Sequence, residues 1–506
     1  MVDPTNTGYA LYELAERTAD EVALTDPNGT LTWSEVALRI NAVAHALLEM
    51  EFGDRRLAVL GSNCIDTFIV YAGALVAGVG TIFINYQSTA QEVEYLSVDG
   101  GASAIWSSPE YIPVAQAAAD HLDIPVLANL GPHFAQSVLD QTPIGQPPLA
   151  RSATTDLIYT SGTTGRPKGV EVPALPIATI GDRLAIMERH HMNGLGPHLV
   201  SGPLYHSGPH GAVGLLLTGN QVTLVGRFEA NAVLDAIESD RIATSVMVPT
   251  HLVRLLALPE ERRRNSDVSS LRMIGLTGSI CPISVKNAII EWFGPVLREA
   301  YGGSETPILS FIMSDESLEH PGSVGRVSAP FHALVLDEHG SPCPTGEDGV
   351  LYFVDDTGRG IRYYNDPEKT AAAHLRPGVF TLGDVGHVDE EGYLYITGRV
   401  TDMVISGGVN IYPAECERVL YTHPAVKDVA LIGQPNVEMG ERLVGIVATS
   451  DPEVTVDDLI DYCRQSIAAY KVPKQLVLVS EVPRSPMGKL DKAAAQRVFA
   501  EMTEAK

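Results

Sequence analysis

Basic residues are scarce in this sequence. It has 35 Lys and Arg against 62 Asp and Glu, which gives a formal net charge of −27. A surface of that sign repels polyanions, whereas a general nucleic-acid-binding protein needs the opposite balance. Any site for a phosphate group must therefore be local, built from a few basic side chains and backbone amides.

Cysteine is also scarce, and no two cysteines form a CxxC pair. The odd number and wide spacing exclude a disulfide framework and a zinc ribbon, and they fit reduced thiols in a cytoplasmic protein. The first residues have no basic region followed by an apolar run, so we expect no signal peptide. The five cysteines are Cys64, Cys281, Cys343, Cys416 and Cys463.

Long apolar runs are nearly absent. The run "TFIVYAGALVAGVGTIFI" at 67–84 reaches the length of a membrane-spanning helix. It contains Gly73, Gly78 and Gly80, and it ends in β-branched residues. These features favour a buried helix, a glycine turn and a core strand, and no second run of this kind supports a membrane protein. We expect no stable membrane insertion.

The length of 506 residues exceeds what one average domain needs. Up to about residue 400, helix-like and strand-like runs alternate, which indicates α/β layers. The last part, of about 105 residues, is typical of a small α+β domain. The expected fold class is α/β, with a large domain at 1–400 and a small mobile domain at 401–506. A Pro-rich connector is expected at 141–152, and the charged stretch 258–270 is expected to be a solvated loop.

The stretch "TSGTTGRPKG" at 160–169 concentrates anion-binding chemistry. Small residues let successive backbone N–H groups converge on an anion. The hydroxyls of Ser161, Thr163 and Thr164 add donors, and Lys168 adds a charge that suits a phosphate. The preceding "DLIYT" is typical of a core strand, which would deliver this loop rigidly.

This stretch is not a Walker loop. In a Walker loop, four residues separate the first glycine from a Gly-Lys-Ser/Thr triplet, whereas here Lys168 stands between Pro167 and Gly169. On composition alone, a flexible Gly/Ser/Thr turn is an equally good interpretation.

The decapeptide resembles the signature loop of the adenylate-forming superfamily, which includes acyl-CoA synthetases, adenylation domains and luciferases. The resemblance covers nearly the whole chain. It implies that the anion is ATP, that a carboxylate attacks the α-phosphate, and that Thr164 also helps to hold Mg²⁺. The nucleotide-binding residues implied here are Thr160, Ser161, Gly162, Thr163, Thr164, Gly165 and Lys168. Further segments match in the family's order: "LTWSEV" (31–36), "YAGALVAGVGTIFIN" (71–85), "PLYHSGP" (203–209), "YGGSETP" (301–307), "GDVGHVDEEGYLYITGR" (383–399), "DMVISGGVNIYPAECE" (402–417), "YKVPK" (470–474) and "PRSPMGKLDK" (483–492).

The segment "YGGSETP" resembles the family's second nucleotide element. The resemblance implies that Tyr301 stacks on adenine beside Gly302, and that Ser304 hydrogen-bonds the phosphate or the substrate carboxylate. Glu305 would bind Mg²⁺, a hard cation that prefers oxygen ligands. Ser304 stands where the family usually has Thr, which keeps the hydroxyl. The alternative is a surface turn with a solvated glutamate.

Three charged residues near the boundary between the two domains have implied roles. Asp384 would accept both ribose hydroxyls, a task that suits a carboxylate. Arg399 would contact ribose or phosphate, and Asp402 resembles the hinge about which the two domains rotate. For each of these residues, an ordinary salt bridge in a turn is the alternative.

The C-terminal segment "PRSPMGKLDK" places Lys489 at the position of the family's adenylation lysine. Its ammonium would bridge the carboxylate and the α-phosphate and stabilise charge that grows in the transition state. Met487 replaces the usual Ser or Thr, which loosens the local match. An exposed lysine near the C-terminus is the alternative.

The segment "PLYHSGPH" carries His206 and His210 four residues apart. A metal site would need a third ligand, and the sequence has no HExxH motif. The resemblance places His206 beside the acyl or thiol path. Enzymes of the family that activate amino acids usually keep an Asp at this element, where this chain has Tyr205 and His206. An amino-acid substrate is therefore not expected.

Two further elements bear on the substrates. Gly278, Ser279 and Ile280 correspond to an element near adenine and the acyl pocket. The Cys-Pro pair that follows, at 281–282, resembles the corresponding pair in acyl-CoA synthetases that act on fatty, cyclic or steroid acids. In the segment 405–415, Gly407 and Gly408 would line the pantetheine tunnel, where glycine permits close backbone approach.

The resulting hypothesis is an AMP-forming acyl-CoA synthetase that acts on a medium-chain or bulky cyclic hydrophobic acid and uses ATP, Mg²⁺ and CoA. The small domain would rotate between the two half-reactions. Three alternatives stay open: loading of a carrier-protein thiol, a luciferase-like oxidase, and a non-catalytic nucleotide-binding module. A homodimer is compatible with the sequence, and nucleic acid is not an expected partner.

Overall fold

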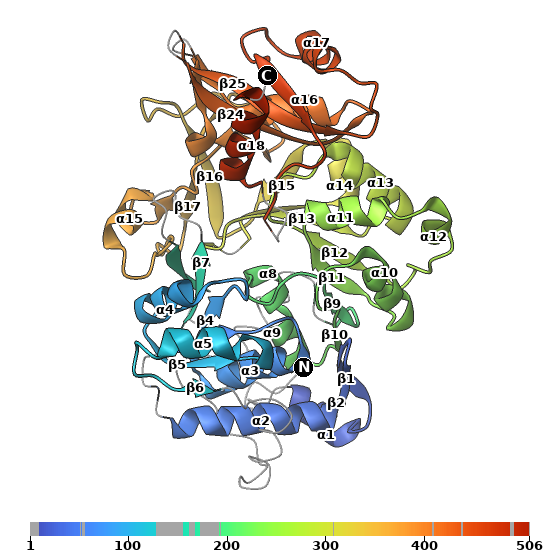
Figure 1. Ribbon diagram of the computed structural model, residues 1–506, viewed down its shortest axis with the longest axis vertical. Coiled ribbons are helices and arrows are strands. Elements are labelled where there is room, and N and C mark those ends of the chain that lie inside the picture. Colours follow the sequence, from blue (N-terminus) through green and yellow to red (C-terminus); the bar gives the residue numbers. More distant parts are fainter. Residues whose placement is uncertain are drawn as a thin grey trace.

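The computed structural model describes residues 10–50, 52, 56–127, 155–160, 167–172, 192, 194–306, 308–406, 409–436, 439–485 and 490–504. The described strands form three sheets with helices packed against them (Figure 1). The fold is α/β, with a large N-terminal part and a small C-terminal part.

The first sheet is parallel except at one edge, where β8 runs antiparallel to β7. Its central strands are fully buried, as their mainly apolar sequences require. The charge-free run forms helix α3 (Ile65–Ala77) and strand β4. Gly78, in the left-handed conformation at φ 71°, ends α3. In order across the sheet, the strands are β6 (Val126–Leu127), β5 (Ala102–Ser107), β3 (Arg56–Leu60), β4 (Gly80–Ile84), β7 (Asp156–Thr160) and β8 (Lys168–Val172).

Helices cover this sheet because their apolar faces match it. Helix α2 (Trp33–Glu49) begins at a capping box, in which Thr32 accepts from the Glu35 amide and Glu35 caps the Thr32 amide. It packs on α3 and buries Ile40 and Leu47 in the core. The other helical elements of this part are α1 (Ala10–Arg17), α4 (Ala90–Asp99), η1 (Pro109–Tyr111) and α5 (Ile112–Ala119).

The second sheet is parallel from β10 to β13 and antiparallel from β14 onward. Helices α10 (Ala230–Ser239), α11 (Pro249–Leu256) and α13 (Ile283–Phe293) contribute to the apolar core on one face of the parallel part. In order, its strands are β18 (His374–Arg376), β19 (Val379–Phe380), β17 (Gly349–Asp355), β20 (Asp384–Val388), β21 (Tyr393–Arg399), β15 (Ser323–Val327), β14 (Ser310–Met313), β13 (Leu297–Tyr301), β12 (Met273–Leu276), β11 (Thr244–Met247), β9 (His198–Val200), β10 (Val222–Leu224), β1 (Val22–Asp26) and β2 (Gly29–Thr32), with β16 (Phe331–Leu336) paired to β17. The remaining helices here are α8 (Ser207–His210), α9 (Ala212–Leu217), α12 (Glu260–Arg264), α14 (Ser314–Glu319) and α15 (Pro367–Ala372).

The third sheet belongs to the C-terminal part and has its own apolar clusters. It follows η2 (Val400–Asp402) in the chain. Helices α16 (Pro413–Tyr421) and α17 (Val456–Ser466) contribute to one cluster, and α18 (Lys492–Glu504) contributes to the other. Its strands are β23 (Val409–Ile411), β22 (Val404–Ser406), β25 (Gly440–Thr449) and β24 (Val426–Asn436), with β26 (Gln475–Val479) paired to β25.

Asn63 joins the first sheet to the second. It follows β3, and its amide nitrogen donates to the carbonyls of Gly202 (2.7 Å) and Gly226 (3.2 Å). Its amide oxygen accepts from the Leu204 backbone amide at 2.8 Å. Asn63 is buried, so these bonds satisfy backbone groups that water does not reach. One side chain therefore fixes the segment that leads to His206.

Two expectations are corrected or limited by the structure. The stretch 258–270 is not wholly a loop, because Glu260–Arg264 forms helix α12, with acidic residues in its first turn and arginines in its last. Such a charge order stabilises even a short helix.

The connector at 141–152 lies outside the described residues. Within the described residues, no helix has both the length and the apolar character to cross a membrane.

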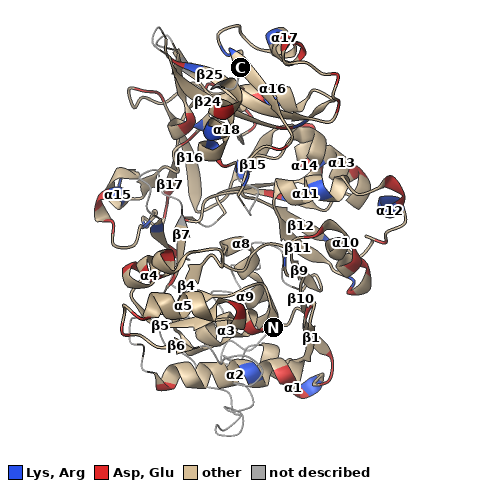
Figure 2. Ribbon diagram, in the orientation of Figure 1, with Lys and Arg blue, Asp and Glu red and all other residues tan. Residues whose placement is uncertain are grey.

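Charges of both signs are interspersed on the outer helices. Figure 2 shows acidic and basic residues together on α12 and α15. Arg262 of α12 pairs with Asp235 and Glu238 of α10. The excess of acid is therefore dispersed, and surface pairs of this kind contribute little to stability.

Candidate active site

The first component of the candidate site lies where strand β7 ends and strand β8 begins. Strand β7 ends at Thr160, and the residues that follow it, Ser161 to Arg166, lie outside the described residues. Strand β8 begins at Lys168, whose ammonium lies 3.0 Å from the carboxylate of Asp366. The register that pairs Thr160 with Lys168 places both ends of the loop at one edge.

Helix α15 brings further charge to this edge. Asp366 caps α15 by accepting from the Lys369 backbone amide at 2.9 Å. That hydrogen bond and the ion pair with Lys168 lower the pKa of Asp366. Burial and the neighbouring Lys168 lower the pKa of Lys369, whose ammonium lies 3.7 Å from the ring centre of Tyr363. Two ammonium groups therefore stand where an anion would be attracted.

Glu305 lies close to this cluster. Its carboxylate accepts from the Tyr363 hydroxyl at 3.4 Å. Burial and Glu305 both raise the pKa of Tyr363, so its hydroxyl stays protonated. A Cβ on Gly303 would come within 2.6 Å of the other Glu305 oxygen, so the missing side chain at 303 makes room for the carboxylate. This open carboxylate fits Mg²⁺, which takes few protein ligands and keeps several waters.

No group of three or more metal-binding side chains occurs in the described part of the chain. Ser304 precedes Glu305 in the same partly exposed turn, together with the exposed Gly302. Thr164, the second residue expected near Mg²⁺, lies outside the described residues.

Asp384 is the centre of a second polar group. Its carboxylate accepts from the Tyr301 hydroxyl at 2.6 Å and from Arg399 Nε at 2.7 Å. Asp384 is 3% exposed, whereas the Arg399 side chain is 58% exposed. Burial and Asp384 raise the pKa of Tyr301 well above its usual value. Burial alone would lower the pKa of Arg399, but the neighbouring Asp384 raises it.

These three residues come from the ends of three strands. Tyr301 ends β13, Asp384 begins β20 and Arg399 ends β21. Strands β20 and β21 pair so that Asp384 stands opposite Arg399. A partly exposed ring beside a buried carboxylate and an arginine can hold a nucleoside by stacking and hydrogen bonding.

Aromatic side chains lie around His206. Its ring centre is 4.4 Å from that of Tyr205, and Tyr205 lies 5.5 Å from Tyr86, which follows β4. His210, at the end of α8, contacts Phe83 at 4.3 Å between ring centres. Such neighbours suit the apolar part of a substrate better than an ammonium group.

The other residues singled out in the sequence are only partly described. Gly278 has φ 97°, a conformation that favours glycine, and it forms an exposed turn with Ser279 and Ile280. Lys489, Gly407 and Gly408 lie outside the described residues. Asp402 pairs with Lys492 of α18 at 2.8 Å.

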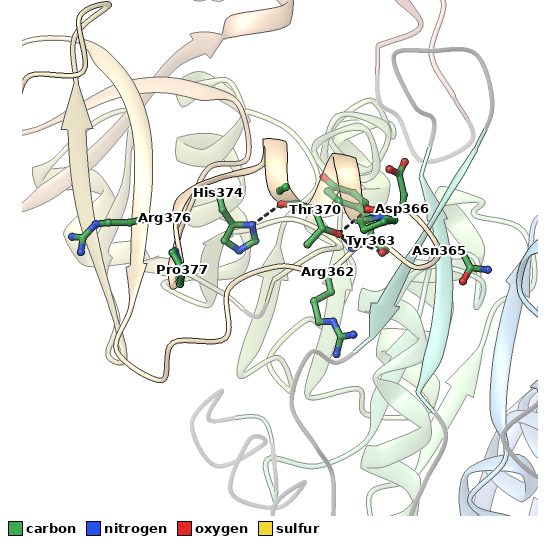
Figure 3. Close-up of a pocket in the computed structure, with 10 residues that line it drawn as sticks. Arg362, Tyr363, Asn365, Asp366, Thr370, His374, Arg376 and Pro377 are labelled. Atoms are coloured by element: carbon green, nitrogen blue, oxygen red, sulfur yellow. Dashed lines mark hydrogen bonds between the residues drawn. The ribbon is translucent and has the colours of Figure 1, made fainter.

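A cavity of about 570 Å³ lies beside α15, and Figure 3 shows the residues that line it. His374 hydrogen-bonds the Thr370 carbonyl through Nδ1 at 2.7 Å and the Ile361 amide through Nε2 at 3.3 Å. Both ring nitrogens are used within the fold, so His374 supports this loop. In Figure 3 Arg376 points away from His374 and Arg362.

Sequence reasoning missed Tyr363, Asp366 and Lys369. All three lie in "YYNDPEKT", whose Asp-Pro pair is a helix-start signal. That signal predicts a cap, and the cap is present. The contact with Lys168 depends on the pairing of residues about 200 positions apart, since the Tyr364 amide donates to the Gly169 carbonyl at 2.9 Å.

Comparisons with known proteins agree with this geometry. The family model for AMP-binding enzymes matches residues 11–357, and the model for the AMP-binding enzyme C-terminal domain matches residues 415–489. An indoleacetate–CoA ligase of Aromatoleum aromaticum is 30% identical over 499 residues, which cover 96% of each chain. A feruloyl-CoA synthase of Amycolatopsis is 32% identical over 488 residues, covering 93% of this chain and 94% of that enzyme.

A solved structure supports the same assignment. The o-succinylbenzoate coenzyme A synthetase of Bacillus subtilis, in complex with ATP and magnesium ion, superposes with a TM-score of 0.78. It is 25% identical, and the match covers 96% of this chain and 99% of that one.

The chain is an AMP-forming acid–thiol ligase that uses ATP, Mg²⁺ and CoA. A carboxylic acid is first converted to its acyl-adenylate with release of pyrophosphate, and the acyl group is then transferred to the CoA thiol. The carrier-protein alternative is not favoured by these relatives. The protein belongs to the adenylate-forming superfamily, in its acyl-CoA synthetase branch.

Proposed function

We propose that this enzyme activates a medium-chain or ring-bearing hydrophobic acid and that the residues above divide the work. Tyr301, Asp384 and Arg399 hold the nucleoside. Lys168 and the 160–165 segment hold the phosphates, Glu305 holds Mg²⁺, and Ser304 contacts the phosphate or the carboxylate. Bound Mg²⁺ would offset the phosphate charge.

The observation that carries this proposal is the convergence of separate segments. Lys168 is paired to Asp366, and Tyr363, three residues before Asp366, donates to Glu305. Tyr301, four residues before Glu305, donates to Asp384. The short segment 301–305 therefore contributes both to the residues proposed to hold the phosphates and to those proposed to hold the nucleoside. Catalysis here consists mainly of positioning and charge stabilisation.

The acid class is supported by two features. Aromatic rings surround His206 and His210, and no carboxylate stands at Tyr205 or His206 to pair with an ammonium group. Two relatives are named for indoleacetate and ferulate, both of which are ring-bearing acids. Gly278, Ser279 and Ile280 would border this acid and the adenine.

We also propose that the chain consists of domains 1–400 and 401–506 and that the second rotates about Asp402 between the half-reactions. Lys489 would act in the first half-reaction, and Gly407 and Gly408 would line the thiol path in the second. Support comes from the separate sheet and apolar clusters of the C-terminal part. The five free cysteines fit a cytoplasmic enzyme. A homodimer is compatible with the sequence.

The experiment that tests the function is pyrophosphate release across short, medium, long, aromatic and steroid side-chain acids, each with and without CoA. We expect release with one class, and acyl-CoA only when CoA is present. Release without acyl-CoA would instead favour a carrier-protein acceptor. Absence of pyrophosphate release with every acid of the panel would contradict the proposed acid class.

Replacing Lys489 with Ala tests its proposed role. The ammonium stabilises charge that develops only during adenylation, so we expect that half-reaction to fall about 100-fold or more. Thioester formation from supplied acyl-adenylate should be spared. Lys427→Ala is the matched control, because Lys427 is an exposed lysine of the same domain. An equal fall in both half-reactions would show that Lys489 has a different role.

A further inference from the structure

The C-terminal end of helix α4 contacts the hairpin that β7 and β8 form. The hydroxyl of Tyr159, in β7, donates to the carboxylate of Asp99 at 2.7 Å, and Asp99 is the last residue of α4. The hydroxyl of Tyr95, about one turn earlier in α4, donates to the Pro167 carbonyl at 3.1 Å. Pro167 directly precedes β8. Helix α4 therefore binds the hairpin on both of its sides.

The last glycine of the stretch 160–169 makes room for the contact between Tyr159 and Asp99. Tyr159 and Gly169 are cross-strand partners, so both project from the same face of the hairpin. A Cβ on Gly169 would lie 3.3 Å from Cζ and 3.4 Å from the hydroxyl oxygen of Tyr159. The ring of Tyr159 therefore lies across the glycine. Lys168 is one residue earlier, so it projects from the opposite face, toward Asp366.

Asp99 also contacts the segment that carries Asp366, the partner of Lys168. Its backbone carbonyl accepts from the side-chain amide of Asn365 at 3.1 Å. Asn365 has φ 53°, a left-handed conformation that asparagine adopts more readily than most residues. Asp99 therefore binds the hairpin through its carboxylate and the segment before α15 through its carbonyl. One residue thus connects the two sides of the ion pair between Lys168 and Asp366.

A buried arginine supports the same connection. Arg56 begins β3, and its guanidinium carbon lies 4.6 Å from the ring centre of Tyr364. Its Nη1 donates to the Gly100 carbonyl at 3.3 Å, directly after α4. Its Nε donates to the Thr155 carbonyl at 2.7 Å, directly before β7. The guanidinium group therefore binds the three segments that Asp99 connects.

The hydrogen bond from Tyr159 to Asp99 is stronger than an ordinary packing contact. Burial and the neighbouring Asp99 raise the pKa of Tyr159, so the hydroxyl stays protonated and donates to the carboxylate. Hydrogen bonds to an ionised acceptor are shorter and stronger than neutral ones. Loss of this bond would leave the hairpin free to shift relative to α4.

We propose that Asp99 and Tyr159 are positioning residues that hold Lys168 at the terminal phosphates of ATP. Tyr159 fixes the hairpin from which Lys168 projects, and Asp99 fixes that hairpin relative to Asp366. A misplacement of about 1 Å can lower a rate about 100-fold. This inference rests on the proposed function, because it concerns the phosphate end of the same site.

The proposal predicts an effect on only one of the two half-reactions. Pyrophosphate leaves during formation of the acyl-adenylate, so the terminal phosphates are absent when the thiol attacks. A displaced Lys168 should therefore slow adenylation and spare thioester formation. A general loss of structure would instead lower both.

Tyr159→Phe removes the hydroxyl and keeps the ring. We measure pyrophosphate release at varied ATP with the most active acid of the panel, and thioester formation from the adenylate of that acid. The kcat/KM for ATP should fall about 10- to 100-fold, while thioester formation should change by less than about twofold. Tyr393→Phe is the matched control, because it removes another hydroxyl that donates to a carboxylate, that of Glu316 at 3.0 Å. Its two rates should stay within about twofold of the wild type.

Asp99 is tested with a matched pair of variants. Asp99→Asn keeps an acceptor for the Tyr159 hydroxyl, whereas Asp99→Ala removes it. We expect Asp99→Ala to resemble Tyr159→Phe and Asp99→Asn to lose less than about fivefold in kcat/KM for ATP. Thermal unfolding of each variant shows whether it remains folded.

A double-mutant cycle tests whether these residues act through Lys168. Tyr159→Phe and Asp99→Ala are each combined with Lys168→Ala. If the lysine carries their effect, each should lower the kcat/KM for ATP of Lys168→Ala by less than about twofold further.

The results distinguish failure of this inference from failure of the function on which it rests. Absence of pyrophosphate release by the wild type with every acid contradicts the proposed function. An unchanged kcat/KM for ATP in Lys168→Ala contradicts the role of Lys168 and the inference with it. Folded Tyr159→Phe and Asp99→Ala variants with normal adenylation, an equal loss in both half-reactions, or an undiminished further loss in Lys168→Ala overturns the inference alone. A loss confined to adenylation and absent in Lys168→Ala supports it.

Discussion

At the scale of single residues, the chemistry depends on charged groups that are held by partners before substrate arrives. Asp384 is buried, yet it keeps two charge-assisted hydrogen bonds, from Tyr301 and Arg399. Hydrogen bonds of this kind are shorter and stronger than neutral ones. The carboxylate is thus oriented in advance, while the exposed part of Arg399 stays accessible.

Replacing Asp384 with Ala should raise the KM for ATP by about 10- to 150-fold, because hydrogen bonds to a charged group contribute about 1.5–3 kcal/mol. Initial rates at varied ATP and saturating acid give this value. Tyr301→Phe is the paired variant: it removes the hydroxyl that donates to Asp384 but keeps the ring, so its effect should be smaller. If Tyr301→Phe and Asp384→Ala weaken ATP equally, stacking of adenine on this ring is not the main contact.

At the scale of elements, the second sheet buries two histidines that take no part in the proposed chemistry. His198 lies in β9, and its Nδ1 is 2.8 Å from the Thr244 hydroxyl. His251 lies in α11 and stacks on Phe228 at 4.0 Å. Burial lowers the pKa of His198 to about 4. Burial, with a smaller contribution from Arg254, lowers that of His251 to about 3.

These shifts predict a loss of stability in acid. Each histidine binds a proton below about pH 6.5 in the unfolded chain but only near pH 3–4 in the folded one. Between these values the unfolded state holds more protons, so stability falls as the pH falls, by about 2 kcal/mol for each histidine at pH 5. The free energy of unfolding should therefore begin to decrease as the pH falls below about 6.5.

The measurement is denaturant unfolding at pH 7.5 and pH 5.0. In His198→Asn, which does not titrate in this range, the difference between the two pH values should shrink by about 2 kcal/mol relative to the wild type. His339→Asn is the control, since that side chain is 79% exposed. An undiminished difference in His198→Asn would mean that other groups account for the acid sensitivity.

At the scale of the whole molecule, the candidate site lies where different sheets meet, so its geometry depends on the contacts between those sheets. Asn63 connects the end of β3 to segments after β9 and β10 by three hydrogen bonds. Asp26 makes a second connection, since its carboxylate accepts from the Ile65 amide at the start of α3 at 3.0 Å. Asp402 and Lys492 contribute an ion pair beside the proposed hinge.

Replacing Asn63 with Ala should lower the free energy of unfolding by about 2–4 kcal/mol, because it leaves buried backbone groups without partners. Equilibrium denaturation measures this change. Ser62→Ala, at the neighbouring position, removes only an exposed hydrogen bond to Glu110 and should cost less than about 0.5 kcal/mol. If Asn63→Ala is as stable as Ser62→Ala, water or rearrangement satisfies those backbone groups.

The sequence alone determined some of the elements and the family of this protein. The run 67–84 was predicted to form a helix, a glycine turn and a strand, and α3, Gly78 and β4 confirm it. Local patterns suffice there, because apolar periodicity, caps and glycine conformations act over a few residues. The motifs likewise indicated an adenylate-forming ligase, which the family models confirm. The roles assigned to individual site residues stay predictions.

Only the tertiary structure decided which distant residues share the site. Asp366 and Lys369 are ordinary helix-start residues in the sequence, and they join Lys168 because residues 363 and 364 pair with β8. Contacts of this kind depend on strand register and packing between layers, which combine segments hundreds of residues apart and leave no periodic trace in the chain.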